Sequence, residues 1–161
     1  MTQYLLTGWA GCHTLLSDQQ PGGHEVEVKN ILLADYANVA EGGKANVMGI
    51  FRNIYSSAFP ARHSDMYLVV VLQASVSEKG QKRNVRIKLL NADATQILVD
   101  YAQAFTVPDA PPGRKPEINI ILRMRDVVFE KPGPYSFSIL VDNDEKATYE
   151  IELTEVKPGN G

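Results

Sequence analysis

The chain of 161 residues has a single cysteine, Cys12, and this scarcity excludes several kinds of site at once. One thiol cannot form an intramolecular disulfide framework or supply a cysteine-based zinc or redox motif, so we expect a reducing, cytoplasmic location. The sequence also has no apolar run near the roughly 18 residues of a membrane-spanning helix. It therefore predicts a protein that does not cross a bilayer.

Positive charge is not in excess either. The 16 lysines and arginines are outnumbered by 19 aspartates and glutamates, which gives a formal net charge of −3. Binding to nucleic acid or to an anionic membrane relies on a clustered positive field, so neither is an expected partner. The apolar fraction of 44% and the charged fraction of 22% are ordinary for a globular domain, and one hydrophobic core suffices for this length.

The N-terminal region lacks the pattern of a folded element. Residues 1–27 combine a weak apolar patch with a turn-forming segment, and we expect a poorly ordered tail. Small residues precede Cys12 as in a lipoprotein processing site, but no lysine or arginine comes before the apolar stretch, which is also short for a signal peptide. An exported lipoprotein and a virion-associated protein are minor alternatives to a cytoplasmic one. The predicted domain spans residues 28–156, followed by a C-terminal tail at 157–161.

Helical periodicity is absent as well, because no window places apolar residues at i, i+3, i+4 and i+7 with matching caps. What recurs instead is a series of short apolar or alternating runs separated by Gly, Pro, Asn and Asp clusters, which is typical of antiparallel β-structure. The runs are 31–37, 46–51, 66–76, 85–89, 97–107, 118–125, 135–142 and 149–154. They predict an all-β fold, an antiparallel two-sheet β-sandwich of about eight strands, with a closed barrel as the rival architecture.

Three segments predict more detail of this fold. Gly42 and Gly43 can supply the positive φ values of a tight turn, so the first two runs form a predicted hairpin. A phosphate-binding loop at the same Gly-Lys pair would need an earlier glycine and a following Ser or Thr, which are absent. Residues 66–76 are apolar on both faces, which places this strand centrally in its sheet. The proline-rich segment 108–116 is predicted to cross between the sheets.

No pattern of catalytic residues is present. His63, Ser64 and Asp65 have the residue types of a hydrolase triad, but neighbours on an extended chain point to opposite faces, whereas a triad must converge. We therefore expect no enzyme, although a hydrolase with an unrecognised site is the least favoured alternative.

Metal-binding patterns are weak. Cys12, His13, His24 and His63 match no zinc spacing. Acidic residues gather at turns, and some sandwiches bind calcium between loops, so calcium at the loop end is an alternative; these residues are Asp142, Asp144 and Glu145, with Asp93 and Asp109 elsewhere. Local hydrogen bonding and solvation explain carboxylates at turns more simply. We expect no cofactor and no resident metal.

Asp35 breaks the pattern of the first strand. It shares its period-two face with Leu33 and Ala37, so a regular strand would direct its carboxylate into the core, where it must be paired or hydrogen-bonded. An ion pair with Lys44 across the hairpin, or a bulge that turns Asp35 outward, would meet this requirement. A functional acid with a perturbed pKa is the minority interpretation.

A possible interaction surface follows the hairpin. Tyr55 and Phe59 precede Arg62 and His63, and aromatic residues with arginine are the types that anchor protein interfaces. Core packing explains the aromatic residues equally well.

Several segments resemble an uncharacterised family of small bacterial and phage proteins. The resemblance rests on residues 33–39, which carry an acidic residue on the first strand, and on 43–51, with a Gly-Lys turn and a glycine before an aromatic strand end. It also includes Pro60 and the Pro-Gly-x-Tyr strand start at 132–135, and covers about residues 30 to 154. The resemblance implies a β-sandwich and no established activity.

The resulting functional hypothesis is a non-catalytic protein-interaction or structural module that binds a protein partner or its own copies. The alternative is a sandwich that binds a carbohydrate or calcium at its loop end. Bare strand edges would favour the first, and clustered exposed aromatic residues would favour a sugar.

Overall fold

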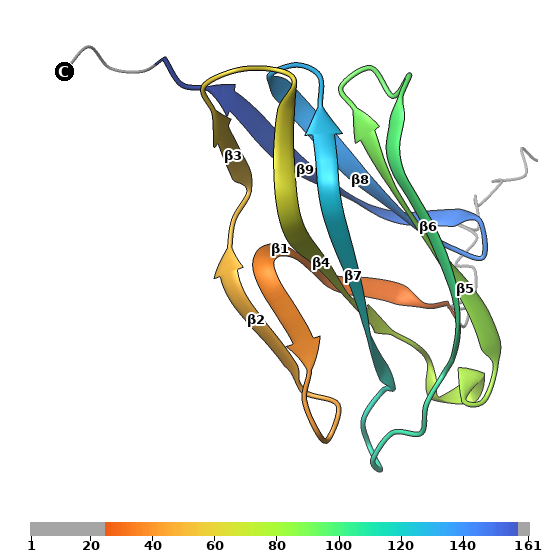
Figure 1. Ribbon diagram of the computed structural model, residues 1–161. Coiled ribbons are helices and arrows are strands. Elements are labelled where there is room, and N and C mark those ends of the chain that lie inside the picture. The colour runs from red at the N-terminus through yellow and green to blue at the C-terminus, as the bar shows by residue number, and fades with distance from the viewer. Residues whose placement is uncertain (1–24, 158–161) are drawn as a thin grey trace, which may run out of the picture.

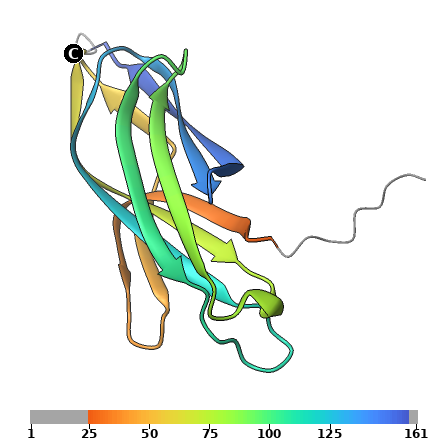
Figure 2. The same cartoon turned by 90° about the vertical axis from the view of Figure 1, so that its right-hand side faces the viewer.

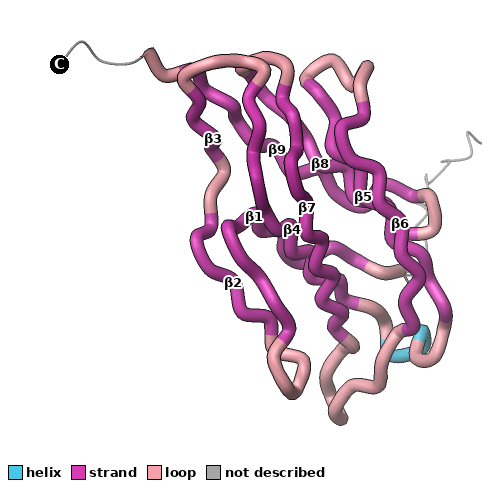
Figure 3. The backbone as a smooth tube through the Cα atoms, viewed as in Figure 1, coloured by secondary structure: helices cyan, strands magenta, loops and turns pink. Residues whose placement is uncertain are grey.

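The computed structural model describes residues 25–157, which form nine β-strands and one short 3-10 helix (Figures 1 and 3). The strands are β1 (Glu27–Val39), β2 (Ala45–Ile50), β3 (Asn53–Ser56), β4 (Ala61–Gln73), β5 (Lys82–Asn91), β6 (Ile97–Thr106), β7 (Glu117–Phe129), β8 (Gly133–Val141) and β9 (Asp144–Glu155). The 3-10 helix, η1, spans Val76–Glu78. None of the helical structure within residues 25–157 has the length and apolarity to cross a membrane. Of the predicted N-terminal tail, residues 1–24 lie outside the described residues, and Val26 is buried in the core.

The strands form two facing sheets with the orders β2-β1-β4-β7 and β3-β9-β8-β5-β6, so the predicted all-β sandwich is confirmed. All paired strands are antiparallel except β3 and β9. The segment 108–116 joins β6 of one sheet to β7 of the other, as predicted (Figure 2). Strand β3 was not among the predicted runs, because four residues are too few to show an alternation.

The two inner faces share one hydrophobic core. Leu33, Leu68, Ile87 and Phe137 are fully buried in it, and full burial of such side chains contributes roughly 1.5–3 kcal/mol each. The predicted central strand is β4, which lies between β1 and β7.

The outer face of β4 is covered as well, because β1 bends and carries the β1–β2 hairpin over β4 and β7 (Figure 1). The hairpin residues Ala37 and Val47 pack on this face against Tyr67, Val69 and Ile121. At the tip, the side-chain amide of Asn119 donates a hydrogen bond of 3.0 Å to the carbonyl of Gly43. Val69 is only 1% exposed as a result.

The predicted ion pair between Asp35 and Lys44 is absent. The register of the hairpin places Gly49 opposite Asp35, whereas Lys44 lies in the turn, where its carbonyl accepts a hydrogen bond of 2.7 Å from the Ala40 amide. The bend turns Asp35 outward, and its side chain is exposed. Asp35 thus faces outward, as the second alternative required, but no register shift marks a bulge at this residue; the only shift in the pairing of β1 lies between Val28 and Asn30.

Candidate interaction site

The four residues of the predicted interaction surface separate into different environments. Tyr55 on β3 is 63% exposed, and together with His63 on β4 it lines a shallow hollow. Arg62 forms an ion pair of 2.9 Å with Asp126 on β7. Phe59 is partly buried against the core. The structure thus brings two of the four predicted residues together.

His63 and Asp65 lie on opposite sides of β4, although residues two apart in a strand normally share a face. Val127, opposite His63 on β7, is buried, whereas Arg125, opposite Asp65, is exposed. Between these two partners, Asp126 has a left-handed backbone with φ of 55°, which switches the phase of the alternation. Asp65 instead accepts a hydrogen bond of 2.9 Å from Nε of Arg123. The residue types of a hydrolase triad therefore do not converge.

The hollow beside His63 has a volume of about 390 Å³ and lies where the chain passes from one sheet to the other. Its lining comes from β1, β2, β3, β4 and the β2–β3 link, and consists of Asp35, Gly49, Ile50, Phe51, Asn53, Ile54, Tyr55 and His63. The rings of Phe51 and His63 are in contact, with centroids 5.6 Å apart. The hollow is thus mainly apolar and aromatic, with one carboxylate.

The pairing of Gly49 with Asp35 shapes this hollow. Gly49 has φ of 69°, a left-handed conformation that favours glycine. A Cβ atom at this position would collide with the carboxylate of Asp35, so the absence of a side chain leaves room for that carboxylate. Beyond the glycine, the amide of Phe51 donates to the carbonyl of Leu33 at 2.9 Å, which holds the chain as it leaves the sheet.

Next to the hollow, four large apolar side chains are exposed, and we call them the edge patch. Tyr36 is 45% exposed, Met48 64%, Ile50 58% and Tyr55 63%. Tyr36 and Met48 are directly opposite each other in the hairpin, and Ile50 and Tyr55 both line the hollow. Groups of exposed apolar side chains are more typical of contact sites than single ones are.

Three of the four edge-patch residues, Met48, Ile50 and Tyr55, lie on strands without charge. β2 and β3 are edge strands of the two sheets, follow each other along one side of the molecule (Figure 1), and contain no charged residue. The opposite edges differ, since β6 contains Asp100 and β7 contains Glu117, Arg123, Arg125 and Asp126. Arg52, between β2 and β3, lies over the ring of Tyr149 with its Cζ atom 4.6 Å from the centroid. Charge on an edge strand discourages pairing with other chains, and β2 lacks this protection.

The acidic residues considered for calcium are engaged elsewhere. Asp142 pairs with Arg83 at 2.7 Å, Asp144 pairs with Lys146 at 2.6 Å, and Glu145 accepts a hydrogen bond of 2.6 Å from Ser138. Hydrogen bonds from Arg83 to Asp142 and Glu78 raise the pKa of its guanidinium. Within residues 25–157 no group of three or more His, Cys, Asp or Glu side chains converges as a metal site would require.

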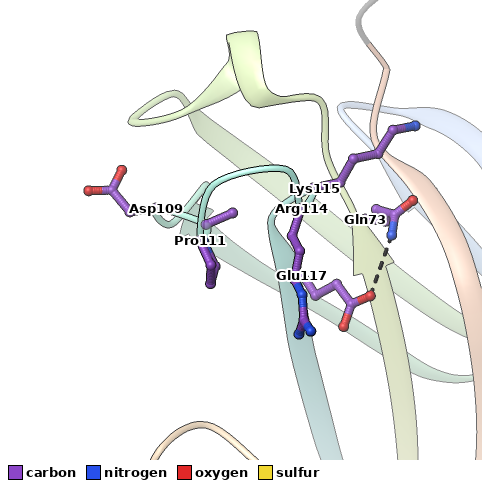
Figure 4. A pocket seen from close by; sticks show the side chains of 7 residues that line it. Gln73, Asp109, Pro111, Arg114, Lys115 and Glu117 are labelled. Carbon is purple, nitrogen blue, oxygen red and sulfur yellow. Dashed lines mark hydrogen bonds between the residues drawn. The ribbon is translucent and has the colours of Figure 1, made fainter.

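The proline-rich crossover borders a second hollow, of about 490 Å³ (Figure 4). Asp109 forms an ion pair of 2.6 Å with Lys79, and Gln73 donates to Glu117 at 3.4 Å. Arg114 and Lys115 project in different directions. Asp93 is exposed in the turn between β5 and β6. Cys12, His13 and His24 lie outside the described residues.

The sequence did not point to Met48, Ile50 or Asn53 as site residues. A signal for the first two was present, because the six-residue run Ala45–Ile50 contains no charged residue. Its free edge depends on the order of the strands, which a sequence does not reveal.

A sequence profile described as a family of unknown function (DUF6941) matches residues 29–154. No curated protein matches the chain significantly. Similar solved structures include the alkylpurine DNA glycosylase AlkC of Pseudomonas fluorescens bound to DNA with an abasic site analog, at 14% identity and a TM-score of 0.46. A CARDB domain from Pyrococcus furiosus in complex with di-metal ions has 11% identity and a TM-score of 0.44, and a β-glucosidase from Listeria innocua has 10% and 0.44.

The similarity to the glycosylase and the similarity to the CARDB domain each cover 81% of this chain, and that to the β-glucosidase covers 82%. They span 31% of the glycosylase, 88% of the CARDB domain chain and 16% of the β-glucosidase.

Proposed function

The chain belongs to the family of unknown function DUF6941, so its role must be sought on its own surface, and we propose that it is a non-catalytic protein-binding module whose β2 edge pairs with an extended segment of a partner protein. Membership confirms the resemblance noted in the sequence, over nearly the same residues.

The uncharged free edge of β2 is the observation that carries the proposal. One side of β2 is paired with β1, and none of the strands described within residues 25–157 pairs with its other side. An extended segment that adds to such an edge gains main-chain hydrogen bonds, while side-chain pockets next to the edge provide selectivity. Met48 and Ile50 of the edge patch supply apolar contacts on this strand, and the hollow lies at the end of β2.

The form of the hollow favours binding over catalysis. It is shallow, and its imidazole, on His63, contacts an aromatic ring rather than an acidic side chain. General-base catalysis gains from a partner that orients the base and from a site sheltered from bulk water. Recognition of a polypeptide requires neither.

The test is a displayed library of random dodecapeptides, selected on the folded chain and on a Met48→Lys/Ile50→Lys variant. We expect peptides with alternating apolar residues to be enriched on the wild type and lost on the variant, because two lysines on an edge strand discourage pairing. Val76→Lys is the matched control, since Val76 is a similarly exposed apolar residue, 62%, on η1.

Two results would contradict the proposal. One is a selection in which no peptide is enriched above the level seen with the double-lysine variant. The other is a set of peptides whose amide chemical-shift changes, measured with labelled protein, fall on β6 or β7 instead of β2.

A further inference from the structure

The hollow at the end of β2 has an unbalanced charge. Among the described residues that line it, Asp35 is the only acidic one, and none is a lysine or arginine. The carboxylate makes no hydrogen bond or ion pair with any residue in the described range 25–157. A charged acceptor is therefore presented on a mainly apolar and aromatic surface.

Three basic residues within or directly beside β2, β3 and β4 lie or are paired elsewhere. Arg52 donates through Nε to the hydroxyl of Tyr149 at 3.2 Å, and Arg62 is paired with Asp126 at 2.9 Å. Lys44 lies in the hairpin turn, beyond the far end of β2. None of these three side chains neutralises Asp35.

The aromatic part of the lining suits a cation as well. Tyr55 is 63% exposed at the rim, and Phe51 and His63 form the ring pair inside. The face of an aromatic ring attracts a lysine or arginine head group, and the aliphatic stem of such a side chain packs on apolar surface such as Ile50 and Ile54. A volume of about 390 Å³ falls within the usual range of binding pockets, roughly 300–1,000 Å³.

We propose that the hollow receives a lysine or arginine side chain of the segment that pairs with β2, with Asp35 as the counter-ion and the aromatic rings as the walls. This inference rests on the proposed function and names the chemistry of the partner: an extended, mainly apolar segment with one basic residue. An acidic residue at the same position is repelled by Asp35, so the hollow selects both sign and register.

The experiment repeats the peptide selection on Asp35→Asn and Asp35→Lys. On the wild type, lysine or arginine is enriched at one peptide position. On Asp35→Asn the enrichment disappears, and on Asp35→Lys it changes to glutamate or aspartate. Asp93→Asn, which removes an exposed carboxylate from the β5–β6 turn, selects the same peptides as the wild type.

A second measurement does not depend on any protein variant. A selected peptide is synthesised with its basic residue and with glutamine in its place, and its affinity for the wild-type chain is measured at increasing salt. We expect the glutamine peptide to bind about tenfold more weakly at low salt, as an interfacial charge pair contributes. Its affinity should also depend less on salt, because the screened charge pair is gone.

The outcomes separate the two proposals. Peptides that bind β2 and are lost on Met48→Lys/Ile50→Lys, but that show no preference for a basic residue, overturn this inference and leave the proposed function standing. A selection without any β2-dependent peptide overturns both.

Discussion

The contact between Asp35 and Gly49 determines how the first hairpin is built. A glycine with φ of 69° stands opposite a carboxylate that occupies the space of its missing side chain. From the sequence, Asp35 could have been an interior acid, one half of an ion pair or an outward-facing residue of a bulge. Gly49, opposite Asp35, has no Cβ and so leaves room for the carboxylate. The structure therefore contains Asp35 as an exposed, outward-facing residue.

Gly49→Ala is therefore expected to destabilise the protein by about 2 kcal/mol, since alanine is disfavoured in the left-handed region by roughly 1–2 kcal/mol and its methyl group would collide with Asp35. Adding Asp35→Ala to the Gly49→Ala variant should recover the part of the stability lost to the collision, whereas the cost of the left-handed backbone remains. Urea denaturation of the two single variants and the double variant measures this coupling. A double variant whose loss equals the sum of the single losses would show that the two residues do not interact.

The ion pair between Asp65 and Arg123 gives a residue-scale dependence on pH. The hydrogen bond from Arg123 lowers the pKa of Asp65 below its ordinary value of 3.8. Because the pKa is lower in the folded chain than in the unfolded chain, the pair stabilises the fold above that ordinary value, and the contribution is lost as the pH falls through the lowered pKa.

Asp65→Asn should consequently lower the urea midpoint slightly near neutrality and flatten its decline below about pH 4. The change is small because the pair is exposed. Urea midpoints measured from neutral to acidic pH test this, with Asp93→Asn as the matched control. A variant with the same acid profile as the wild type would refute the assignment.

At the scale of elements, the alternation of apolar and polar residues was informative wherever a strand has one buried and one solvated face. Residues 85–89, 118–125 and 149–154 fall within β5, β7 and β9. β3 could not be predicted in the same way, since its four residues gain their strand geometry from parallel pairing with β9, a contact between segments far apart in the sequence.

Only part of the candidate site could be predicted from the sequence. Tyr55 and His63 were recognised by residue type and do line one hollow. The separation of Arg62 and Phe59 from them was not predictable, because it depends on the phase switch at Asp126 and on packing against the core.

The hairpin that covers the outer sheet face leads to a prediction of its own. Val69 is 1% exposed beneath this hairpin, so Val69→Thr buries a hydroxyl without an assured partner. We expect a loss of about 1–3 kcal/mol in the free energy of unfolding. Val76→Thr, at a position that is 62% exposed, should change it by less than about 0.5 kcal/mol. Equal effects in thermal or urea unfolding would mean that the hairpin does not shield Val69.

At the scale of the whole molecule, the two lateral sides of the sandwich differ in their protection. The β6–β7 side carries charged residues on both edge strands, and the β2–β3 side carries none on either strand. A net charge of −3 adds only a weak general repulsion between copies. The β2–β3 side is therefore where contacts with other chains meet the least opposition.

An unprotected edge also has a cost when no partner is present, because it can pair with the same edge of another copy. We expect the apparent molecular mass of the isolated chain, measured by light scattering, to increase with protein concentration. It should also increase with salt, which screens the repulsion between negatively charged copies. Met48→Lys should suppress this increase without lowering thermal stability, since Met48 is 64% exposed. Val128→Lys, at a 43% exposed apolar position on β7, should leave it unchanged. If both lysine variants scatter like the wild type, association does not use β2, and the edge is protected by something other than charge.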